Sequence, residues 1–446
     1  MRTPDQLPLL KGLPLIGSLL DYRRDFLGLL KHVADLGPLS RFYVVGERLV
    51  LVNSTELIQQ LLVENGHKLN KSHDSVDASM PLAGHGLFFV EEDHHKAERK
   101  LLAADFTPKA VTQYSELILE CVNDQLAEWK DGQEIPIGKA MVQLTVRIIG
   151  KICLGVDLLA ESESLWATFT VAFECMRDYM TELVPLPLSF PTPSHLAYRK
   201  AVADLDKLIY RVIEEHRRGE NTSHDVINTL LRVQAEAPDG INMTDKQIRD
   251  EVVTMLVAGH ETTANALAFA WAEVACNEEI YQKAIDQVDE VLQGRVPTPA
   301  DLKSLPYVTQ IFMESMRKYP PLYVLDRQNT EPITIGDCEM PAGTVILFSP
   351  YTVHHTPSIY PDPDRFDPDR FTSEGMKAIP KMGFIPFSEG HRVCLGKSLA
   401  MMEAGLIMTR FLQKVRFVSR DKTLPKPLPM ITLRPDPAYS LWAHQR

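Results

Sequence analysis

The chain has 446 residues, 45% of them hydrophobic, and carries a formal net charge of −12. That acidic balance argues against a nucleic-acid-binding protein, because phosphates require a basic surface. Residues 1–20 hold scattered proline and charged residues and no apolar run near the roughly 20 residues of a bilayer span, so we expect neither a transmembrane anchor nor a signal peptide.

Domain organisation and cysteine spacing predict a single domain without zinc sites or disulfide bonds. We find no internal repeat, low-complexity tract or flexible linker, which predicts one large domain over residues 1–446. The six cysteines lack CxxC or Cys/His zinc spacing and lie far apart, at positions 121, 153, 175, 276, 338 and 394. This pattern favours a cytoplasmic protein over a zinc-binding or disulfide-stabilised one.

Helical periodicity dominates the chain. Apolar residues recur at three- and four-residue spacing over residues 24–36, 55–64, 92–103, 109–130, 139–153, 165–182, 195–218, 225–235 and 280–292. Strand-like alternation is confined to residues 40–53, folded at Gly46-Glu47, and to residues 333–349 and 432–443. The pattern predicts a mainly α protein with small β-sheets.

The longest predicted helix starts after Thr244, which forms a capping-box signature with Gln247. It contains neither glycine nor proline until Gly259 and continues to about Cys276. At 1.5 Å per residue it would be roughly 48 Å long. Residues 252–258 are apolar on nearly every side, as expected of a buried central helix.

A polar cluster interrupts this apolar helix at residues 258–263, which read Ala-Gly-His-Glu-Thr-Thr. The glycine costs roughly 1 kcal/mol relative to alanine, so we expect a compensating role. A threonine hydroxyl bonded to a carbonyl of the preceding turn would open a groove in the helix. The alternative is a helix with a polar patch that has no function.

Cys394 lies on a loop braced by Gly390 and Gly396, just before a predicted helix at residues 397–412. Backbone N–H groups at a helix start favour a thiolate, so this cysteine is a candidate metal ligand. The two glycines would let the backbone approach a flat macrocycle. The alternative is a buried structural cysteine beside a turn.

The loop sequence FxxGxRxCxG, from Phe387 to Gly396, resembles the haem-binding loop of the cytochrome P-450 family, and the cluster at 258–263 resembles that family's oxygen-activation motif. The resemblance runs from KGLPLIGSLL near the amino terminus to the last strands and is of the soluble bacterial type. It implies the cytochrome P-450 fold and a monooxygenase whose haem b iron is bound by Cys394, with Phe387, Gly390 and Gly396 shaping the loop. Thiolate ligation favours O–O bond cleavage.

The same resemblance assigns roles along the chain. Thr262 would stabilise dioxygen activated at the iron, Glu261 would help to deliver protons to it, and His260 would be a neighbour without a catalytic role. Glu314 and Arg317, three residues apart in a predicted helix at 307–318, would form a buried network with Arg370 behind the cysteine loop. Taken alone, such a pair would be an ordinary surface ion pair.

Haem propionates need cationic or hydrogen-bonding partners. By resemblance these are Arg392 and Arg327, together with His95 and Arg99, which share one face of the helix at 92–103. Adjacent His94 could replace His95, and each residue alone could be an ordinary surface charge.

Family resemblance also places a substrate pocket above the haem. The matching segments supply an almost wholly apolar lining of Leu82, Leu87, Phe88, Met255, Val257, Ala258, Leu322, Val324, Leu325, Met430 and Ile431. Such a lining suits a fatty acid, a terpenoid or a steroid-like molecule, although core packing explains any single residue equally well.

Electrons must reach the haem through another protein, since the chain has no FMN domain, iron-sulfur cysteine run or dinucleotide fingerprint. We expect NAD(P)H to act through a ferredoxin or flavodoxin and its reductase. A basic patch near the cysteine loop would dock an acidic partner: Lys96, Arg99, Lys100, Lys381, His391 and Lys397. A solvated lysine face is the alternative.

Two other functions stay open at this point. A peroxide-driven oxygenase or peroxide-rearranging enzyme could use the same fold, but it has less need of Glu261 and Thr262. A haem-based gas sensor or electron carrier would bind haem without a substrate pocket.

Overall fold

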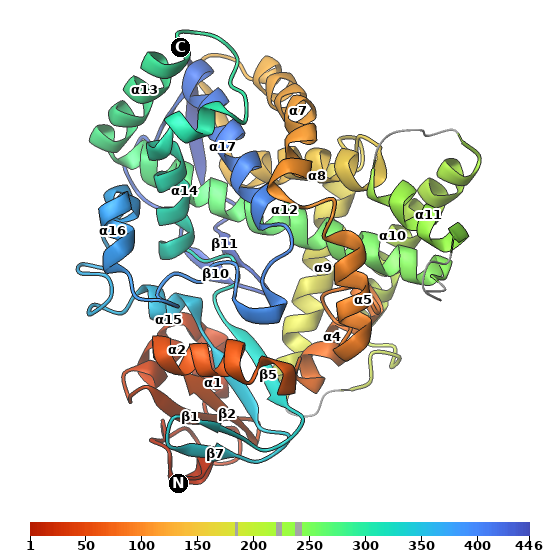
Figure 1. The fold of residues 1–446 in the computed structure, drawn as a ribbon, viewed down its shortest axis with the longest axis vertical. Helices are drawn as coiled ribbons and strands as arrows, with labels where there is room; N and C mark the ends of the chain where they lie inside the picture. Colours follow the sequence, from red (N-terminus) through yellow and green to blue (C-terminus); the bar gives the residue numbers. More distant parts are fainter. Residues whose placement is uncertain (183–185, 220–224, 237–242) are drawn as a thin grey trace.

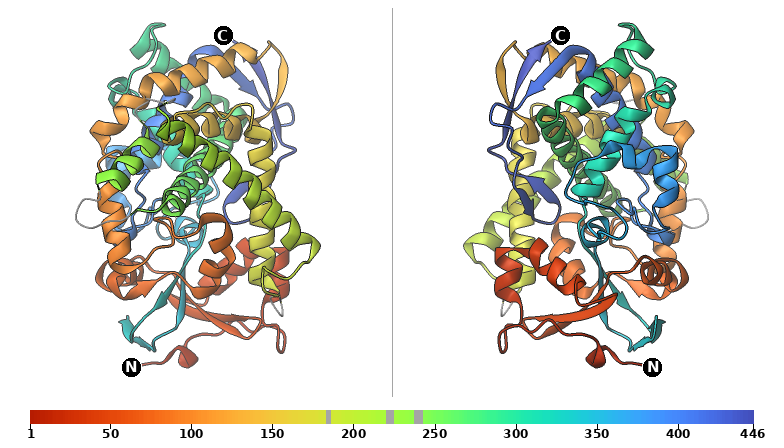
Figure 2. Two further views of the ribbon diagram at one scale, coloured as in Figure 1. Left: turned by 90° about the vertical axis from the view of Figure 1, so that its right-hand side faces the viewer. Right: turned by 90° about the vertical axis from the view of Figure 1, so that its left-hand side faces the viewer.

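A computed structural model describes residues 1–182, 186–219, 225–236 and 243–446. Figure 1 shows a β-rich part, which contains the amino terminus, below a larger and mostly helical part, which contains the carboxyl terminus. The side views of Figure 2 show the same division. The long helix α12 (Asp245–Cys276) crosses the helical part.

The described helices cover most of the chain. Their bounds are α1 (Leu19–Arg24), α2 (Phe26–Ala34), α3 (Thr55–Gln59), α4 (His73–Ala83), α5 (Glu92–Leu102), α6 (Pro108–Val111), α7 (Ser115–Glu128), α8 (Ile137–Leu154), α9 (Ser162–Thr181), α10 (Pro193–Arg217), α11 (Val226–Glu236), α13 (Glu278–Leu292), α14 (Pro306–Lys318), α15 (Pro350–His354), α16 (Ser373–Ala378) and α17 (Lys397–Lys414).

The largest sheet has the strand order β1-β2-β8-β5-β3. Its strands are β1 (Leu39–Val44), β2 (Glu47–Val52), β8 (Val345–Phe348), β5 (Leu325–Asn329) and β3 (Leu69–Asn70), and only the β2–β8 pair is parallel. An antiparallel sheet joins β4 (Gln133–Pro136), β12 (Ser440–Gln445) and β9 (Val415–Val418). Two hairpin pairs complete the β-structure: β6 (Ile333–Ile335) with β7 (Cys338–Met340), and β10 (Pro427–Pro429) with β11 (Leu433–Pro435).

The prediction of a mainly α protein with small sheets is confirmed. Helix α12 has the predicted bounds, and both hydrogen bonds of the Thr244–Gln247 capping box are present. The predicted helix over 24–36 is wrong in one respect. The helix is interrupted at Asp25, which separates α1 from α2. The Asp25 side chain caps α2 by accepting a hydrogen bond from the Gly28 backbone N–H.

Helix α12 is the axis of the helical core, and it packs directly against α8, α10, α14 and α17. A Cβ atom on Gly259 would lie 2.7 Å from two side-chain carbons of Ile149 on α8. The glycine is therefore required for close packing of two helices, which compensates its cost in helix propensity. Across the described residues, no helix combines the length and apolar character that a membrane crossing demands.

Candidate functional site

The cysteine loop connects a short 3-10 turn, η8 (Gly390–Arg392), to the start of α17. The Cys394 backbone N–H donates to the carbonyl of Phe387 over 2.9 Å, which closes the loop. Cys394 is the only one of the six cysteines with an exposed side chain. The loop therefore presents its sulfur to an open space, as a metal ligand must be presented.

Opposing influences act on the Cys394 thiol. Burial of its surroundings raises the pKa of the thiol, whereas the Gly396 and Lys397 backbone N–H groups and the positive charge of Arg99 lower it. These N–H groups belong to the first turn of α17, where partial positive charge favours a thiolate. The predicted contribution of a helix start is thus present.

The two loop glycines have different surroundings. Gly390 has a φ of +76°, and a Cβ atom there would lie 2.2 Å from the carbonyl oxygen of Leu62. Its small size is therefore needed for contact with the chain at Leu62, not with a macrocycle. Gly396 has open space around it, with the Cys394 sulfur as its nearest neighbour at 4.0 Å, which suits a loop that a flat group approaches.

Cationic side chains gather beside this loop, and the charge of Asp326 acts on Arg327 without forming an ion pair with it. Arg327 is 3% exposed, stacks over the Phe348 ring, and donates a hydrogen bond to the Asp326 carbonyl. Neither Arg327 nor half-buried Arg99 forms an ion pair with any carboxylate that the structure describes. A buried guanidinium without a carboxylate is costly, so this arrangement indicates an anionic ligand.

His95 and Lys71 are further basic side chains beside Arg99 and Arg327, and both have lowered pKa values. Burial, followed by the charges of Arg99, His391 and Lys71, lowers the pKa of His95 to about 4. Burial and the charges of Arg327 and Arg392 hold the pKa of Lys71 well below its usual range. Sequence reasoning missed Lys71, whose position before α4 carries no recognisable motif. His94 is exposed and lies outside this buried group.

Arg392 differs from the other predicted propionate partners. Its guanidinium forms an ion pair with Glu91 and donates to the carbonyl of Val90 over 2.7 Å. Burial lowers the pKa of Arg392 to about 10. The side chain therefore already has a carboxylate partner, and it ties the cysteine loop to the segment before α5.

The polar cluster of α12 divides between two environments. The Thr262 hydroxyl donates to the Ala258 carbonyl over 2.8 Å, as predicted for a threonine bonded to the preceding turn, although the helix remains continuous. Glu261 is fully buried, and its Oε1 accepts hydrogen bonds of 2.5 Å from both Arg434 Nε and Thr432 Oγ1. His260 is buried and bonds to the Leu256 carbonyl.

The arrangement of Glu261 was not predicted. Its carboxylate is paired with Arg434 on β11, 173 positions later in the chain. Thr262 and Thr432 both line the large cavity described below, whereas Glu261 lies behind them. Of its two hydrogen-bond partners in the described part of the chain, Thr432 lines the cavity and Arg434 does not.

Glu314, Arg317 and Arg370 lie together, as the sequence predicted. Arg317 and Glu314 are fully buried and form two hydrogen bonds of 2.7 and 2.9 Å. Arg370 Nε lies 3.5 Å from Glu314 Oε1. Burial raises the pKa of Glu314, and the charge of Arg317 opposes that effect.

The buried network reaches the cysteine loop through His354, which sequence reasoning missed. Arg317 donates to the His354 carbonyl over 2.9 Å, and the Ile385 backbone N–H donates to His354 Nε2 over 3.0 Å. Ile385 in turn accepts a hydrogen bond from the backbone of Ser388. The network therefore fixes the chain that enters the loop.

A cavity of about 1480 Å³ lies against the middle of α12. It is lined by most of the predicted pocket residues: Leu82, Phe88, Val257, Ala258, Leu322, Val324, Leu325, Met430 and Ile431. Leu87 and Met255 do not line the cavity, so their assignment to the pocket was wrong. Met255 belongs to the buried core, and Leu87 packs against that core.

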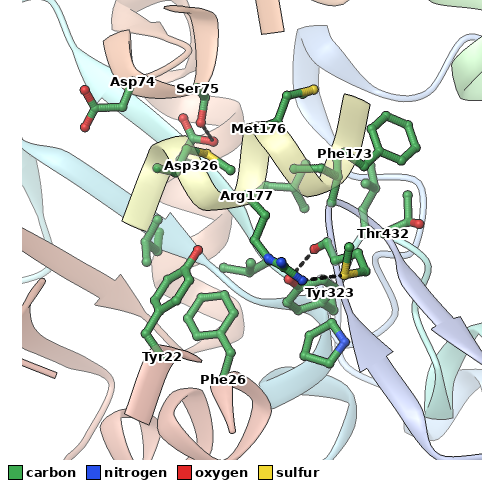
Figure 3. A pocket seen from close by; sticks show the side chains of 18 of the residues that line it. Tyr22, Phe26, Asp74, Ser75, Phe173, Met176, Arg177, Tyr323, Asp326 and Thr432 are labelled. Atoms are coloured by element: carbon green, nitrogen blue, oxygen red, sulfur yellow. Dashed lines mark hydrogen bonds between the residues drawn. The ribbon is translucent and has the colours of Figure 1, made fainter. Parts of the chain in front are cut away.

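Helix α9 supplies a wall of the cavity that was not predicted. Figure 3 shows Phe173, Met176 and Arg177 on this helix, with Arg177 extending toward Tyr323. The signal in the sequence was the apolar spacing of Phe173, Met176 and Met180, which looked like ordinary core packing. Aromatic residues Tyr22 and Phe26, from α1 and α2, line the outer end.

Comparison with known proteins agrees with this geometry. The family model described as Cytochrome P-450 matches residues 7–442. The chain belongs to the cytochrome P-450 family. It is a cytochrome P-450 monooxygenase with the mainly helical fold of that family, and the family implies a haem-thiolate cofactor.

Several curated relatives are bacterial. Cyclooctat-9-en-7-ol 5-monooxygenase of Streptomyces melanosporofaciens is 31% identical over 95% of this chain and 90% of its own length. Cyclooctatin synthase of the same organism is 30% identical, with 97% and 92% covered. Pentalenene oxygenase of Streptomyces avermitilis is 27% identical, with 95% and 93% covered.

The residues around the cysteine loop fit a haem. The group requires a thiolate, space for a flat ring and cations for two carboxylates. Cys394 offers an exposed sulfur, Gly396 has open surroundings, and neither Arg327 nor Arg99 forms an ion pair among the described residues. The donor set therefore matches the cofactor that the family implies.

Proposed function

We propose that this cytochrome P-450 hydroxylates a terpenoid, with electrons supplied by a separate ferredoxin or flavodoxin and its reductase. The observation that carries the proposal is the large cavity that Thr262 lines, whose wall is apolar along part of α12. Its volume of about 1480 Å³ includes a region lined by charged residues such as Arg23 and Lys426, and its apolar part beside Val257 and Ala258 suits a hydrocarbon skeleton. The names of the Streptomyces relatives support a terpenoid over a fatty acid or steroid.

Cys394 is the proposed iron ligand, and Arg327, Arg99 and His95 are the proposed partners of the propionates. When bound, a haem-thiolate centre supplies activated oxygen for insertion into a C–H bond. His95 would act as a neutral hydrogen-bonding group, because its pKa is lowered to about 4. Arg392 would hold the segment before α5 through Glu91 and would contact a propionate only if that pairing rearranged.

Thr262 is the proposed positioning group for oxygen and protons at the end of the cavity. Its hydroxyl donates to Ala258, so its lone pairs remain available to accept a hydrogen bond in the cavity. Glu261 could pass protons toward the cavity after it takes one up from solvent, either by leaving Arg434 or by protonating the Thr432 hydroxyl as that hydroxyl gives its own proton to the cavity. In the ion pair with Arg434 the carboxylate accepts hydrogen bonds and has no proton to give.

The proposed partner surface surrounds the cysteine loop. Lys100, Lys381 and Lys397 are exposed there, which suits an acidic electron donor. His391 is exposed too, but burial and the charges of Arg327 and Arg99 lower its pKa, which favours a neutral ring. Lys96 is also exposed but pairs with Asp93, and Arg99 is half-buried and its charge acts on Cys394, so these two residues contribute less than predicted.

The test is a panel of ligands added to the purified ferric protein. Sesquiterpene and diterpene alcohols, a long-chain fatty acid and a steroid are each titrated while the haem absorbance is followed. We expect a shift from low to high spin with terpenoids, and hydroxylated product after addition of NADPH, ferredoxin and ferredoxin reductase. A shift confined to the fatty acid or steroid would contradict the substrate class.

The peroxide-driven alternative is tested in the same assay. Hydrogen peroxide replaces NADPH and the redox proteins, and the initial rate of product formation is compared. We expect the peroxide-supported rate to be the lower of the two. A faster rate with peroxide would contradict the proposed electron supply and leave the substrate class unaffected.

A further inference from the structure

Two glutamates from different helices meet in the core away from the iron site. Glu98 on α5 is 8% exposed and Glu251 on α12 is 1% exposed. Their carboxyl groups are close enough for each to influence the pKa of the other. Two adjacent buried carboxylates repel strongly, so such a pair is stable only when it retains a proton.

The surroundings do not neutralise this pair with a cation. Among the described residues, no N–H or hydroxyl group forms a full hydrogen bond to either oxygen of Glu251 or to Oε2 of Glu98. The Leu87 backbone N–H lies near enough to lower the pKa of Glu251, but burial and Glu98 outweigh it and raise that pKa to about 9. Burial also raises the pKa of Glu98.

Two other titratable groups, Asp250 and His94, act on the two glutamates. Asp250 is a further carboxylate whose charge acts on both groups, and it forms ion pairs with Arg249 and Lys246. His94 on α5 acts from the other side and favours the charged form of Glu98. The net effect of these neighbours leaves the proton on the pair.

The pair lies beside segment 84–91, which connects α4 to α5. His85 donates its backbone N–H to Asp250 over 3.0 Å. A Cβ atom on Gly86 would lie 2.1 Å from the hydroxyl of Thr254, so the backbone rests directly on α12. Leu87 follows, with its N–H near Glu251.

Segment 84–91 also reaches the active site at its other end. Phe88 and Phe89 line the substrate cavity. The carbonyl of Val90 and the carboxylate of Glu91 bind Arg392, two residues before the cysteine. Anything that fastens this segment to α12 therefore fixes a cavity wall and a brace of the cysteine loop.

We propose that Glu98 and Glu251 share one proton and together fasten segment 84–91 to α12, which makes them a positioning pair for the cavity and the cysteine loop. The inference rests on membership of the P-450 family and on this geometry, and it is independent of the proposed terpenoid substrate. When the segment opens, both groups become hydrated and both ionise at neutral pH.

The sign of the pH dependence follows from the two states. The closed state holds a proton up to the raised pKa of Glu251, whereas hydrated carboxyl groups lose theirs near pH 4 to 5. Closing therefore takes up one proton, and the closing equilibrium weakens about tenfold per pH unit from about pH 5 to about pH 9. Above pH 9 it becomes constant.

The experiment is amide hydrogen exchange of segment 84–91 in the haem-containing enzyme at pH 6.5, 7.5 and 8.5, corrected for intrinsic exchange rates. In the wild-type protein we expect the protection factor to fall about 100-fold between pH 6.5 and 8.5. Glu251→Gln keeps a hydrogen-bond donor toward Glu98 but cannot ionise, so we expect protection to change less than threefold.

Glu403→Gln is the matched control. Glu403 is also a buried glutamate whose pKa is raised by burial, to about 8, but it lies on α17. This variant should keep the wild-type pH dependence in segment 84–91. If Glu251→Gln fails to bind haem, the double variant Glu98→Gln/Glu251→Gln serves in its place, because neither side chain can then ionise and the pH dependence should be lost.

Two results would overturn the proposal. One is a wild-type protection factor that is constant between pH 6.5 and 8.5. The other is a haem-containing Glu251→Gln variant, or Glu98→Gln/Glu251→Gln double variant, with the full wild-type fall. The hydrogen-exchange experiment contains no substrate. Its outcome therefore tests this proposal even if the terpenoid titration shows no spin shift.

Discussion

Replacing Arg434 with methionine removes the cation that pairs with Glu261 in the helical core. Arg434 Nε lies 2.5 Å from Glu261 Oε1, the Glu261 side chain is fully buried, and the Arg434 side chain is 8% exposed. Methionine can still pack where the guanidinium lies, over the rings of Trp166 and Phe173. Because the buried carboxylate is left without a cation, we expect the free energy of unfolding to fall by about 3–5 kcal/mol.

The double variant separates the cost of an unpaired charge from the value of the ion pair itself. Glu261→Gln removes the negative charge and keeps an acceptor for the Thr432 hydroxyl. In the combination of Glu261→Gln with Arg434→Met, no buried charge is left alone. We therefore expect the double variant to be more stable than Arg434→Met alone, by about 2 kcal/mol or more.

The assay is urea unfolding of the haem-containing protein, followed by tryptophan fluorescence and by haem absorbance, for the wild type, both single variants and the double variant. The free energy from each transition is compared in a double-mutant cycle. A double variant whose loss equals the sum of the two single losses would refute the reasoning. So would an Arg434→Met variant with wild-type stability.

The other predictions concern the haem and its electrons. Thr262→Ala should retain haem and ligand binding but release peroxide in place of product, with Thr262→Ser close to wild type; unchanged coupling of NADPH to product would remove Thr262 from the mechanism. Arg327→Gln should speed the loss of haem to apomyoglobin by about 10- to 100-fold, as expected for one lost charge-assisted hydrogen bond of about 1.5–3 kcal/mol; a wild-type rate would exclude it as a propionate partner. Raising NaCl from 50 to 500 mM should slow reduction of the iron by ferredoxin in stopped-flow measurements, and a rate indifferent to salt would contradict electrostatic docking at the cysteine loop.

Local signals in the sequence predicted the elements that carry the site. The capping box at Thr244 and the absence of proline located α12, because both act within a few residues. The strands β3 and β4, of two and four residues, were missed, since elements this short show no alternation. Helix α4 was also missed, because it contains Pro81 and a polar first half.

Pairings between distant segments could not be predicted. Nothing near Glu261 indicates that its partner is Arg434, and nothing near Arg392 points to Glu91. Each pair forms only because the fold brings separate elements into contact. Motif spacing identifies a residue's type and neighbourhood, whereas the partner that decides its charge comes from tertiary packing.

The proposed Cys394–iron bond is tested most directly by the absorbance spectrum of the reduced, carbon monoxide-treated protein. We predict the strongly red-shifted Soret band of haem-thiolate proteins in the wild type, and its loss in Cys394→Ser while haem is retained. Wild-type protein without that band, or a Cys394→Ser variant that still shows it, would contradict the assignment of Cys394 as the iron ligand.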